Sequence, residues 1–289
     1  MKELRLNAYA KINLTLDVHR RREDGYHEIE TVLHTVALHD TVVLRETGQG
    51  ISVNCSDPSL PQDQRNLVYR TAQLLKETFK VERSVEIDLT KRIPAAAGMG
   101  GGSSDAAVTL LGLAQMWKLR LDRRQLLDLA ARVGSDVPFF LFGGAALARG
   151  RGEKLQPLNP MPATWMVLAR PPLEVSTPWA YRNLDVSSLR RRPETAKMVG
   201  ALVREDVAAV GQLVCNVFED LIVTAHSIVG ELRDRMRSLG AFGAGMTGTG
   251  PTVFGFVPNE AAARWIAAEL SAVDRGVDTM VTRTFAEAR

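Results

Sequence analysis

The chain has 289 residues, of which 45% are hydrophobic and 24% are charged, and its formal net charge is +3. This composition is typical of an ordinary globular enzyme with a sizeable core, and it excludes a disordered chain or a protein that coats nucleic acid. The length fits one large or two moderate domains, and we expect two.

The two cysteines, Cys55 and Cys215, lie far apart and form no CxxC pair. The sequence therefore indicates neither a disulfide framework nor a thiolate metal site. No stretch approaches the roughly 18 uninterrupted apolar residues of a membrane span. The N-terminus also lacks the apolar run of a signal peptide. We expect a soluble cytoplasmic protein without a membrane partner.

A strand, a turn and further strands open the chain. Apolar and polar residues alternate from Ile12 to Val18, which is the period of a half-buried strand and places Lys11 and Asn13 together on its polar face. The pattern then predicts a turn at 24–25, strands at 29–38 and 41–44, and a loop over 46–65. This start is typical of an antiparallel sheet.

The middle of the chain predicts a strand, a glycine loop and a helix in succession. The expected elements, in order, are a helix at 67–79 capped by Asn66, a strand at 85–89, a helix at 106–117 capped by Ser103, Ser104 or Asp105, and a helix at 123–133 capped by Asp122. The glycine loop lies between the strand and the second helix.

Three prolines, at positions 157, 160 and 162, mark a division of the chain. We expect an N-terminal domain at 1–157 and a C-terminal domain at 158–289. The C-terminal elements are a strand at 165–169, helical stretches around 195–214 and 226–239, a second glycine loop, a strand at 252–257, a helix from Glu260 and a strand at 277–284. Strands and helices segregated in this way predict an α+β fold.

The sharpest chemical feature is the segment Pro94-Ala-Ala-Ala-Gly98-Met99-Gly100-Gly101-Gly102-Ser103-Ser104-Asp105. Three successive glycines expose backbone N–H groups to phosphate oxygens without a β-carbon in the way. The helix that follows adds the positive end of its dipole. The segment predicts an anion site, although it is neither a Walker A loop nor a GxGxxG motif. A purely structural glycine turn is the alternative.

Three blocks of the sequence resemble the galactokinase, homoserine kinase, mevalonate kinase and phosphomevalonate kinase (GHMP kinase) superfamily. Residues 94–107 are similar to the Pro-x-x-x-Gly-Leu-Gly-Gly-Gly-Ser-Ser-x-Ala-Ala signature with which that superfamily holds ATP phosphates, and Met99 stands where Leu is usual. The other two blocks are 10–14 and 245–251. Together they span nearly the whole chain.

The resemblance implies a two-domain α+β GHMP kinase fold, with a ribosomal protein S5 domain 2-like N-terminal half and a ferredoxin-like C-terminal half. It implies ATP and Mg²⁺ as well. The nucleotide contacts that it implies are Asn66, Lys91, Pro94, Ala95, Ala96, Ala97, Gly98, Met99, Gly100, Gly101, Gly102, Ser103 and Ser104. The sequence shows no Mg²⁺ ligand cluster beyond hydroxyls and Asp136, so the metal ligands stay unassigned.

Three further blocks, at 24–27, 134–140 and 150–153, resemble one branch of the superfamily. That branch phosphorylates a hydroxyl of a cytidyl diphosphate sugar-alcohol in the non-mevalonate route to isoprenoids. The resemblance implies Asp136 as the catalytic base and Lys11 as its electrostatic partner. Without it, Asp136 is more simply a helix cap and Lys11 a solvated strand lysine.

The same resemblance assigns residues to the substrate. Asn13, on the face of Lys11, is expected to orient the reacting hydroxyl. Aromatic rings give stacking area to a cytosine, and an imidazole can read the base edge. The expected substrate residues are Asn13, Tyr26, His27, Thr177, Tyr181, Thr247, Gly248 and Thr249. Ordinary packing is the alternative for each tyrosine, and a tight turn is the alternative for the 247–250 loop.

Other functions stay open at this point. Another kinase of the superfamily, acting on mevalonate or homoserine, and a nucleotide-binding regulator without catalysis are the alternatives. The chain lacks a basic stripe interleaved with exposed aromatic residues, so we expect no nucleic-acid partner. We expect a small-molecule substrate and a monomer or weak homodimer.

Overall fold

Two long strands, β1 (Glu3–Arg21) and β2 (His27–Thr47), organise the first sheet of the computed structural model, which describes residues 3–47, 50–272 and 276–285. They form an antiparallel hairpin, in which Lys11 lies opposite Thr35. Within the described residues the sheet has seven strands in the order β3-β4-β2-β1-β8, with β5 beside β2 and β6 beside β5. The remaining strands are β3 (Ile51–Cys55), β4 (Ser84–Thr90), β5 (Ala145–Gly150), β6 (Lys154–Leu158) and β8 (Cys215–Asn216).

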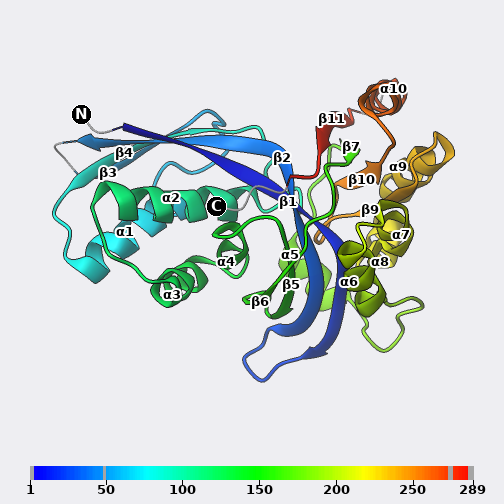
Figure 1. Ribbon diagram of the computed structural model, residues 1–289, viewed down its shortest axis with the longest axis horizontal. Helices are drawn as coiled ribbons and strands as arrows, with labels where there is room; N and C mark the ends of the chain where they lie inside the picture. Colours follow the sequence, from blue (N-terminus) through cyan, green and yellow to red (C-terminus); the bar gives the residue numbers. More distant parts are fainter. Residues whose placement is uncertain (1–2, 48–49, 273–275, 286–289) are drawn as a thin grey trace.

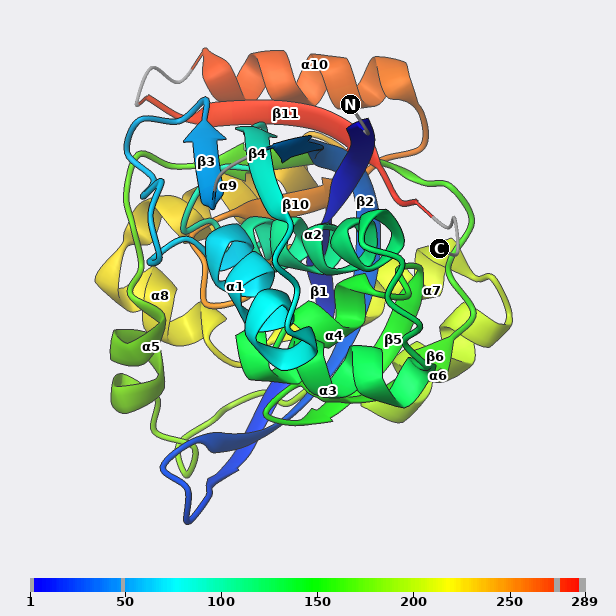
Figure 2. The same ribbon diagram turned by 90° about the vertical axis from the view of Figure 1, so that its left-hand side faces the viewer.

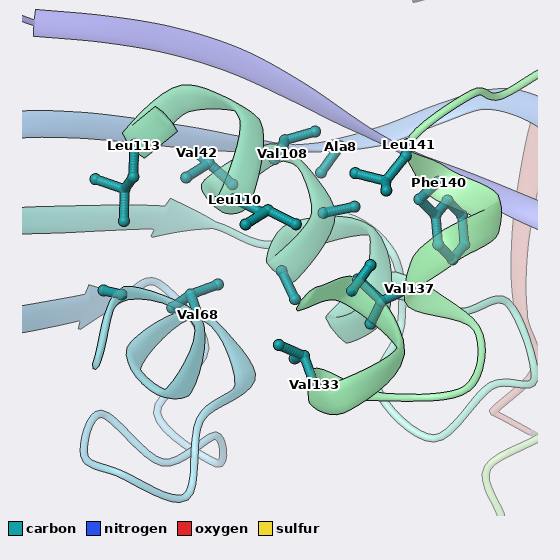
Figure 3. Close-up of a cluster of buried hydrophobic side chains, with 14 of the residues drawn as sticks. Ala8, Val42, Val68, Val108, Leu110, Leu113, Val133, Val137, Phe140 and Leu141 are labelled. Carbon is teal, nitrogen blue, oxygen red and sulfur yellow. The ribbon is translucent and has the colours of Figure 1, made fainter. Parts of the chain in front are cut away.

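Four helices cover one face of this sheet (Figure 1). They are α1 (Leu67–Phe79), α2 (Gly101–Met116), α3 (Arg123–Val133) and α4 (Val137–Phe140). Their apolar side chains meet those of β1 and β2, as Val108 and Leu110 of α2 do near Ala8 and Val42 (Figure 3). This core fixes α2, and therefore the glycine loop before it, against the sheet.

A second sheet has four antiparallel strands in the described chain, in the order β11-β7-β10-β9. The strands are β7 (Trp165–Arg170), β9 (Gly243–Met246), β10 (Val253–Phe256) and β11 (Asp278–Arg283). The accompanying helices are α5 (Thr177–Asn183), α6 (Thr195–Val203), α7 (Val207–Leu213), α8 (Glu219–Ala225), α9 (Ser227–Ser238) and α10 (Glu260–Ser271). Figure 2 shows α10 and β11 at one end of the molecule and the β1–β2 turn at the other.

A buried histidine lies where the two sheets join. The Met161 N–H, between β6 and β7, donates to Nε2 of His34 on β2 at 3.0 Å, and Nδ1 of His34 lies 2.8 Å from the Thr35 carbonyl oxygen. Nε2 must therefore be the acceptor and Nδ1 the protonated nitrogen. Burial lowers the pKa of His34 to about 4, so the ring is neutral in the folded protein at neutral pH.

The α+β fold class is confirmed, and several predicted elements agree closely with the structure. Asn66 caps α1 through its side chain, and Asp122 forms a capping box with Gln125 at the start of α3. The predicted domain boundary between residues 157 and 158 stays a prediction. No helix in the described ranges is long and apolar enough to cross a membrane.

Some predictions are wrong. The stretch 46–65 is not all loop, because β3 pairs in parallel with β4. The helical prediction at 195–214, by contrast, agrees with α6 and α7, and Asp206 caps α7 through its side chain. The helix predicted from Ala106 begins at Gly101, with Gly100 at its N-cap and no side-chain cap. The low helix propensity of glycine applies to helix interiors. Gly101 and Gly102 lie instead in the first turn, where the N–H groups have no partner within the helix.

Candidate active site

A cleft of about 580 Å³ lies between the first glycine loop, β1 and the C-terminal half of the chain. Segments from distant parts of the sequence form its wall. The lining residues used below are Lys11, Asn13, Thr31, Arg65, Asn66, Lys91, 94–98, 100–103, Asp105, Asp136, Arg151, Thr177, Tyr181, Gly248 and Thr249.

The glycine triplet forms the N-terminus of α2 at this cleft. Gly98 and Gly100 have φ of +72° and +71°, which glycine adopts without strain. A β-carbon on Gly102 would meet only Leu67 at 3.6 Å, so the backbone there is open to a ligand. The 16 residues of α2 direct their first N–H groups and the positive end of the dipole toward the cleft. This arrangement suits a phosphate.

Lys11 is buried rather than solvated, with 4% of its surface exposed. Its Nζ donates to the carbonyl oxygen of Gly98 at 2.6 Å and to Oδ1 of Asn13 at 2.7 Å. Its backbone N–H donates to the Met99 carbonyl oxygen at 3.0 Å. Burial lowers the pKa of Lys11, and the Asp136 carboxylate opposes that shift. The ammonium is therefore held at the glycine loop, within electrostatic range of Asp136.

Asn13 connects Lys11 to the second glycine loop. Besides the Lys11 ammonium, its Oδ1 accepts from the Gly248 N–H at 2.8 Å and from the Thr247 hydroxyl at 3.1 Å. Its Nδ2 donates to the Thr31 hydroxyl at 2.8 Å. The side chain is thus fixed on every side, and it cannot rotate without breaking several hydrogen bonds.

Asp136 stands at the N-cap position of α4, but its side chain makes no capping hydrogen bond. The carboxylate is half-buried and forms part of the cleft wall. A β-carbon on Gly152 would lie 3.8 Å from its Oδ1, so the 150–153 turn closes over one side of it. The helix-cap alternative does not account for this carboxylate, because a cap would direct it to a backbone N–H.

The two glycine loops touch through their backbones. A β-carbon on Gly98 would lie 3.1 Å from the Thr247 carbonyl carbon, and one on Gly248 would lie 2.9 Å from the Gly98 α-carbon. The Thr247 hydroxyl also donates to the Gly98 carbonyl oxygen at 3.2 Å. The loops therefore form one surface, to which the Thr249 hydroxyl adds a 3.0 Å hydrogen bond with that of Thr177.

Aromatic side chains gather at one end of the cleft. The rings of His27 and Tyr181 have centroids 5.1 Å apart, and Tyr181 packs edge-on against Phe218 at 4.8 Å. Burial raises the pKa of Tyr181, and Asp136 adds to the shift, so its hydroxyl stays protonated. Tyr26 is 54% exposed, and the Arg151 guanidinium lies 4.8 Å from its ring centre.

Lys91 is bound by two carboxylates. Its Nζ pairs with Asp40 and, at 2.7 Å, with Oδ2 of Asp105. Burial lowers the pKa of Lys91, but Asp105 and Asp40 raise it more, and the net shift is upward. Asp40 also accepts from the N–H groups of Arg92 and Ile93, at 2.5 and 2.8 Å. This cluster fixes the chain just before the first glycine loop.

Asn66 is also engaged by the protein. Its oxygen accepts from the Val68 N–H at 3.1 Å, and its Nδ2 donates to the Pro61 carbonyl oxygen at 2.7 Å. One further donor and one further acceptor position remain on the amide for a ligand at the cleft.

The structure brings most of the predicted site residues to one cleft, but not all of them to its wall. Met99 is buried in the core with 1% exposure and contributes its carbonyl rather than its side chain. The others outside the lining set are Ser104, Tyr26, His27 and Thr247. Sequence reasoning missed Asp105, Thr31, Arg65 and Arg151. Arg151 lies in the 150–153 block, between Gly150 and Gly152. A positive charge between two glycines could have indicated an anion-binding residue.

A metal cage is not part of this arrangement. Among residues 3–47, 50–272 and 276–285, no group of three His, Cys, Asp or Glu side chains is placed to hold a metal ion.

Comparisons with known proteins show similarity in sequence and fold. Residues 66–144 match the GHMP kinases N terminal domain and residues 198–275 match GHMP kinases C terminal. A 4-diphosphocytidyl-2-C-methyl-D-erythritol kinase of Shouchella clausii is 47% identical over 88% of this chain and 86% of its own. A crystal structure of 4-(cytidine 5'-diphospho)-2C-methyl-D-erythritol kinase has 36% identity, covers 98% of this chain and 100% of its own, and has a TM-score of 0.84. A homoserine kinase from Cytophaga hutchinsonii, at 22% identity over 99% of this chain and 96% of its own, has a TM-score of 0.76 and shares the fold.

Proposed function

The chain belongs to the 4-diphosphocytidyl-2-C-methyl-D-erythritol kinases, within the ATP-dependent GHMP kinases, and on that premise we propose its reaction and the residues that perform it. The proposed reaction transfers the γ-phosphoryl group of ATP to the 2-hydroxyl of 4-diphosphocytidyl-2-C-methyl-D-erythritol, in the non-mevalonate isoprenoid pathway. One observation supports it most: a buried ammonium, an uncapped carboxylate and a glycine-lined helix N-terminus share one cleft.

In this proposal Asp136 is the general base. Its carboxylate accepts the proton of the 2-hydroxyl as that oxygen attacks the γ-phosphorus. The bond from the γ-phosphorus to the β–γ bridging oxygen breaks, and ADP leaves with those electrons. Lys11 offsets the negative charge on the transferring group. Asn13, fixed beside Lys11, orients the same hydroxyl.

The N-terminus of α2 receives the ATP phosphates. The N–H groups of Gly100, Gly101 and Gly102 are open to a ligand on the cleft side, and Ser103 adds a hydroxyl there. Pro94 and 95–98 line the same cleft, whereas Met99 and Ser104 are buried outside its lining and stay predicted contacts. Since the described side chains offer no metal cage, Mg²⁺ would enter as a complex with the ATP phosphates. Asn66 and Lys91 remain the proposed adenine-side contacts.

The aromatic end of the cleft receives the cytidyl group. Tyr26 and Tyr181 supply ring faces, and His27 supplies a ring nitrogen for the base edge. Thr177, Gly248 and Thr249 line the same cleft, and Thr247 belongs to the same loop, so we assign these four residues to the substrate diphosphate. A shared surface of two glycine loops supports that placement, because bare backbone N–H groups suit phosphate oxygens.

We also propose the setting of the enzyme. The free cysteines, Cys55 and Cys215, agree with a reducing compartment such as the cytoplasm. We propose that the enzyme is a monomer or weak homodimer and has no nucleic-acid partner. We also propose that its domains are 1–157 and 158–289.

An ADP-release assay on the purified chain tests the reaction. The substrates are 4-diphosphocytidyl-2-C-methyl-D-erythritol, mevalonate and homoserine, each with ATP and Mg²⁺. Of the three substrates, we expect only the cytidyl substrate to give ADP release. In Asp136→Asn we expect that ADP release to be lost while the affinity for ATP is retained. ADP release with mevalonate or homoserine instead would favour another GHMP kinase activity. ATP binding without ADP release on any substrate would favour a nucleotide-binding regulator.

A further inference from the structure

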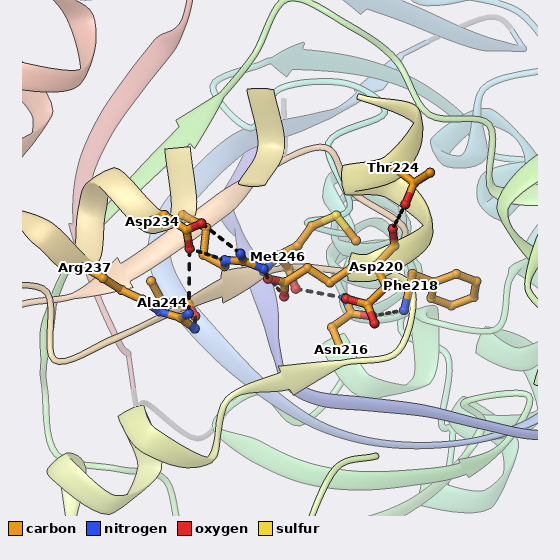
Figure 4. A network of polar contacts seen from close by, with 10 residues as sticks. Asn216, Phe218, Asp220, Thr224, Asp234, Arg237, Ala244 and Met246 are labelled. Atoms are coloured by element: carbon orange, nitrogen blue, oxygen red, sulfur yellow. Dashed lines mark hydrogen bonds and ion pairs between the residues drawn. The ribbon is translucent and has the colours of Figure 1, made fainter. Parts of the chain in front are cut away.

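Asn216 on β8 holds the second glycine loop through its carbonyl groups, whereas Asn13 holds it through the Gly248 N–H. Its Nδ2 donates to the Met246 carbonyl oxygen at 2.9 Å, and its Oδ1 accepts from the Phe218 N–H at 3.0 Å (Figure 4). The same Nδ2 also donates to the Gly248 carbonyl oxygen at 2.7 Å. The side chain is buried, with 6% of the residue exposed. The donors and the acceptor of the amide thus each face a complementary backbone group, which only a carboxamide of this length can satisfy.

A second contact holds the same end of the loop. Oε2 of Glu219 lies 3.4 Å from the Met246 N–H, and Oε1 of Glu219 pairs with Arg233 of α9 at 2.5 Å. Asn216 and Glu219 therefore hold Met246 through its carbonyl and its N–H. Because β8 pairs in parallel with β1, Leu16 opposite Asn216, the strand that carries Lys11 and Asn13 also positions Asn216.

The two hydrogen bonds of Asn216 orient two peptide units. In a trans peptide the C=O and the following N–H point in opposite directions. The Met246 carbonyl faces Asn216, and the Thr247 N–H accordingly points away, to the Thr252 carbonyl oxygen at 3.0 Å. The Gly248 carbonyl also faces Asn216, so the Thr249 N–H points away from it. No residue in the described ranges accepts that N–H.

Gly248 and Thr249 form part of the cleft wall beside Lys11 and Asn13. We propose that Asn216 is a positioning residue that turns the Gly248–Thr249 peptide so that the Thr249 N–H donates to a phosphate oxygen of the bound substrate. The inference rests on the proposed function for the identity of that phosphate. Asn13 holds the Gly248 N–H and Asn216 holds the Gly248 carbonyl, so the peptide on each side of Gly248 is held by one asparagine.

Kinetics of Asn216→Ala test the inference, together with hydrogen exchange of the loop. Loss of the side chain frees the Gly248–Thr249 peptide to rotate, and we expect kcat for the cytidyl substrate to fall about 100-fold while KM for ATP stays nearly constant. Exchange of the loop amides should accelerate in the same variant. Asn216→Asp has the same shape without N–H donors, and we expect an equal or larger loss of kcat.

Asn259→Ala is the matched control. Asn259, which is exposed, caps α10 through its side chain, so this variant also loses an asparagine side-chain hydrogen bond to a backbone N–H but touches neither glycine loop. We expect its kcat and its loop exchange to equal those of the parent. If Asn216→Ala does not fold, Asn216→Ser is used in its place, because serine keeps one donor. We expect its kcat to lie between the parental value and the 100-fold reduction expected for Asn216→Ala.

The outcomes separate the inference from the proposed function. A folded Asn216→Ala with parental kcat and parental loop exchange overturns the inference and leaves the function intact. A parent chain that does not phosphorylate the cytidyl substrate overturns the proposed function. In that case, faster exchange at the loop in Asn216→Ala but not in Asn259→Ala still supports the orienting role, and equal exchange overturns it.

Discussion

The backbones of Gly98 and Gly248 are in direct contact, since a β-carbon on Gly248 would lie 2.9 Å from the Gly98 α-carbon. The two residues come from opposite halves of the chain, and the cleft wall is continuous across them. The contact makes the geometry of each loop depend on the other.

Gly248→Ala tests this contact. The new methyl group must displace the first glycine loop and with it the carbonyl that binds Lys11, so we expect kcat/KM to fall about 100-fold. Gly144→Ala is the control, because Gly144 has φ of +69°, close to the +60° of Gly248, but a β-carbon there meets nothing within 4 Å. Both variants carry the strain of a positive φ, so a similar loss of activity in the two would mean that strain alone is responsible.

His34 predicts a dependence of stability on pH. Its folded pKa of about 4 lies below the unfolded value of 6.5, so the unfolded chain binds the extra proton between these values. Its contribution is therefore complete above about pH 6.5 and declines as the pH falls toward about 4, by about 3 kcal/mol in all. The measurement is the free energy of unfolding in urea across this range, for the parent and for His34→Gln.

The His34→Gln variant isolates this contribution, since other groups titrate in the same range. Burial raises the pKa of Asp105, and a raised carboxyl pKa acts in the opposite direction, lowering stability as the pH rises. The difference between parent and variant cancels Asp105. If that difference did not change with pH, His34 would not be the buried neutral base that its hydrogen bonds indicate.

Lys91 and its two carboxylates predict an asymmetric response to substitution. Lys91→Met leaves Asp40 and Asp105 buried without their cation, and we expect a loss of about 3–5 kcal/mol in the free energy of unfolding. Asp105→Asn removes one of two negative charges that share a single ammonium, so its cost should be about 1 kcal/mol or less. Chemical denaturation measures both. Equal costs would argue against a cluster with one excess negative charge.

Tyr26 predicts a separation of KM from kcat in the proposed reaction. The residue is 54% exposed, with the Arg151 guanidinium over one face of its ring, and in the proposed function a cytosine stacks on the other face. Removing one base–aromatic stack typically costs about 1–3 kcal/mol. Tyr26→Ala should therefore raise KM for the cytidyl substrate about tenfold or more at nearly constant kcat. Tyr26→Phe retains the ring and should behave like the parent. An unchanged KM in Tyr26→Ala would remove Tyr26 from the base site.

The sequence predicted the elements whose signals are local. The Asn66 and Asp122 caps begin α1 and α3, and the alternation at 85–89 lies within β4. It did not predict β3, in which only Val53 is fully buried and Ile51 and Cys55 are partly buried. The partner strand β4 also lies more than a helix further along the chain. Pairing between distant segments leaves little trace in five residues.

The candidate site shows the same limit. The alternation around Lys11 correctly put it beside Asn13, but it predicted a solvated face. Burial of that face depends on Thr247 and Gly248, which arrive from the far end of the chain. Asn216 gave no signal at all, since its partners are backbone carbonyls that any residue type presents. The signal at Asp136 was ambiguous, and the missing capping hydrogen bond argues only against the helix-cap interpretation.

Backbone contact between the glycine loops also limits how this enzyme can change. When a side chain grows in a protein interior, a neighbouring side chain can often shrink to make room. No neighbouring side chain could become smaller to make room at Gly98 or Gly248, because each of them faces main-chain atoms of the other loop. No paired replacement can rescue a larger residue at either position, so we expect relatives that keep this contact to carry glycine at both.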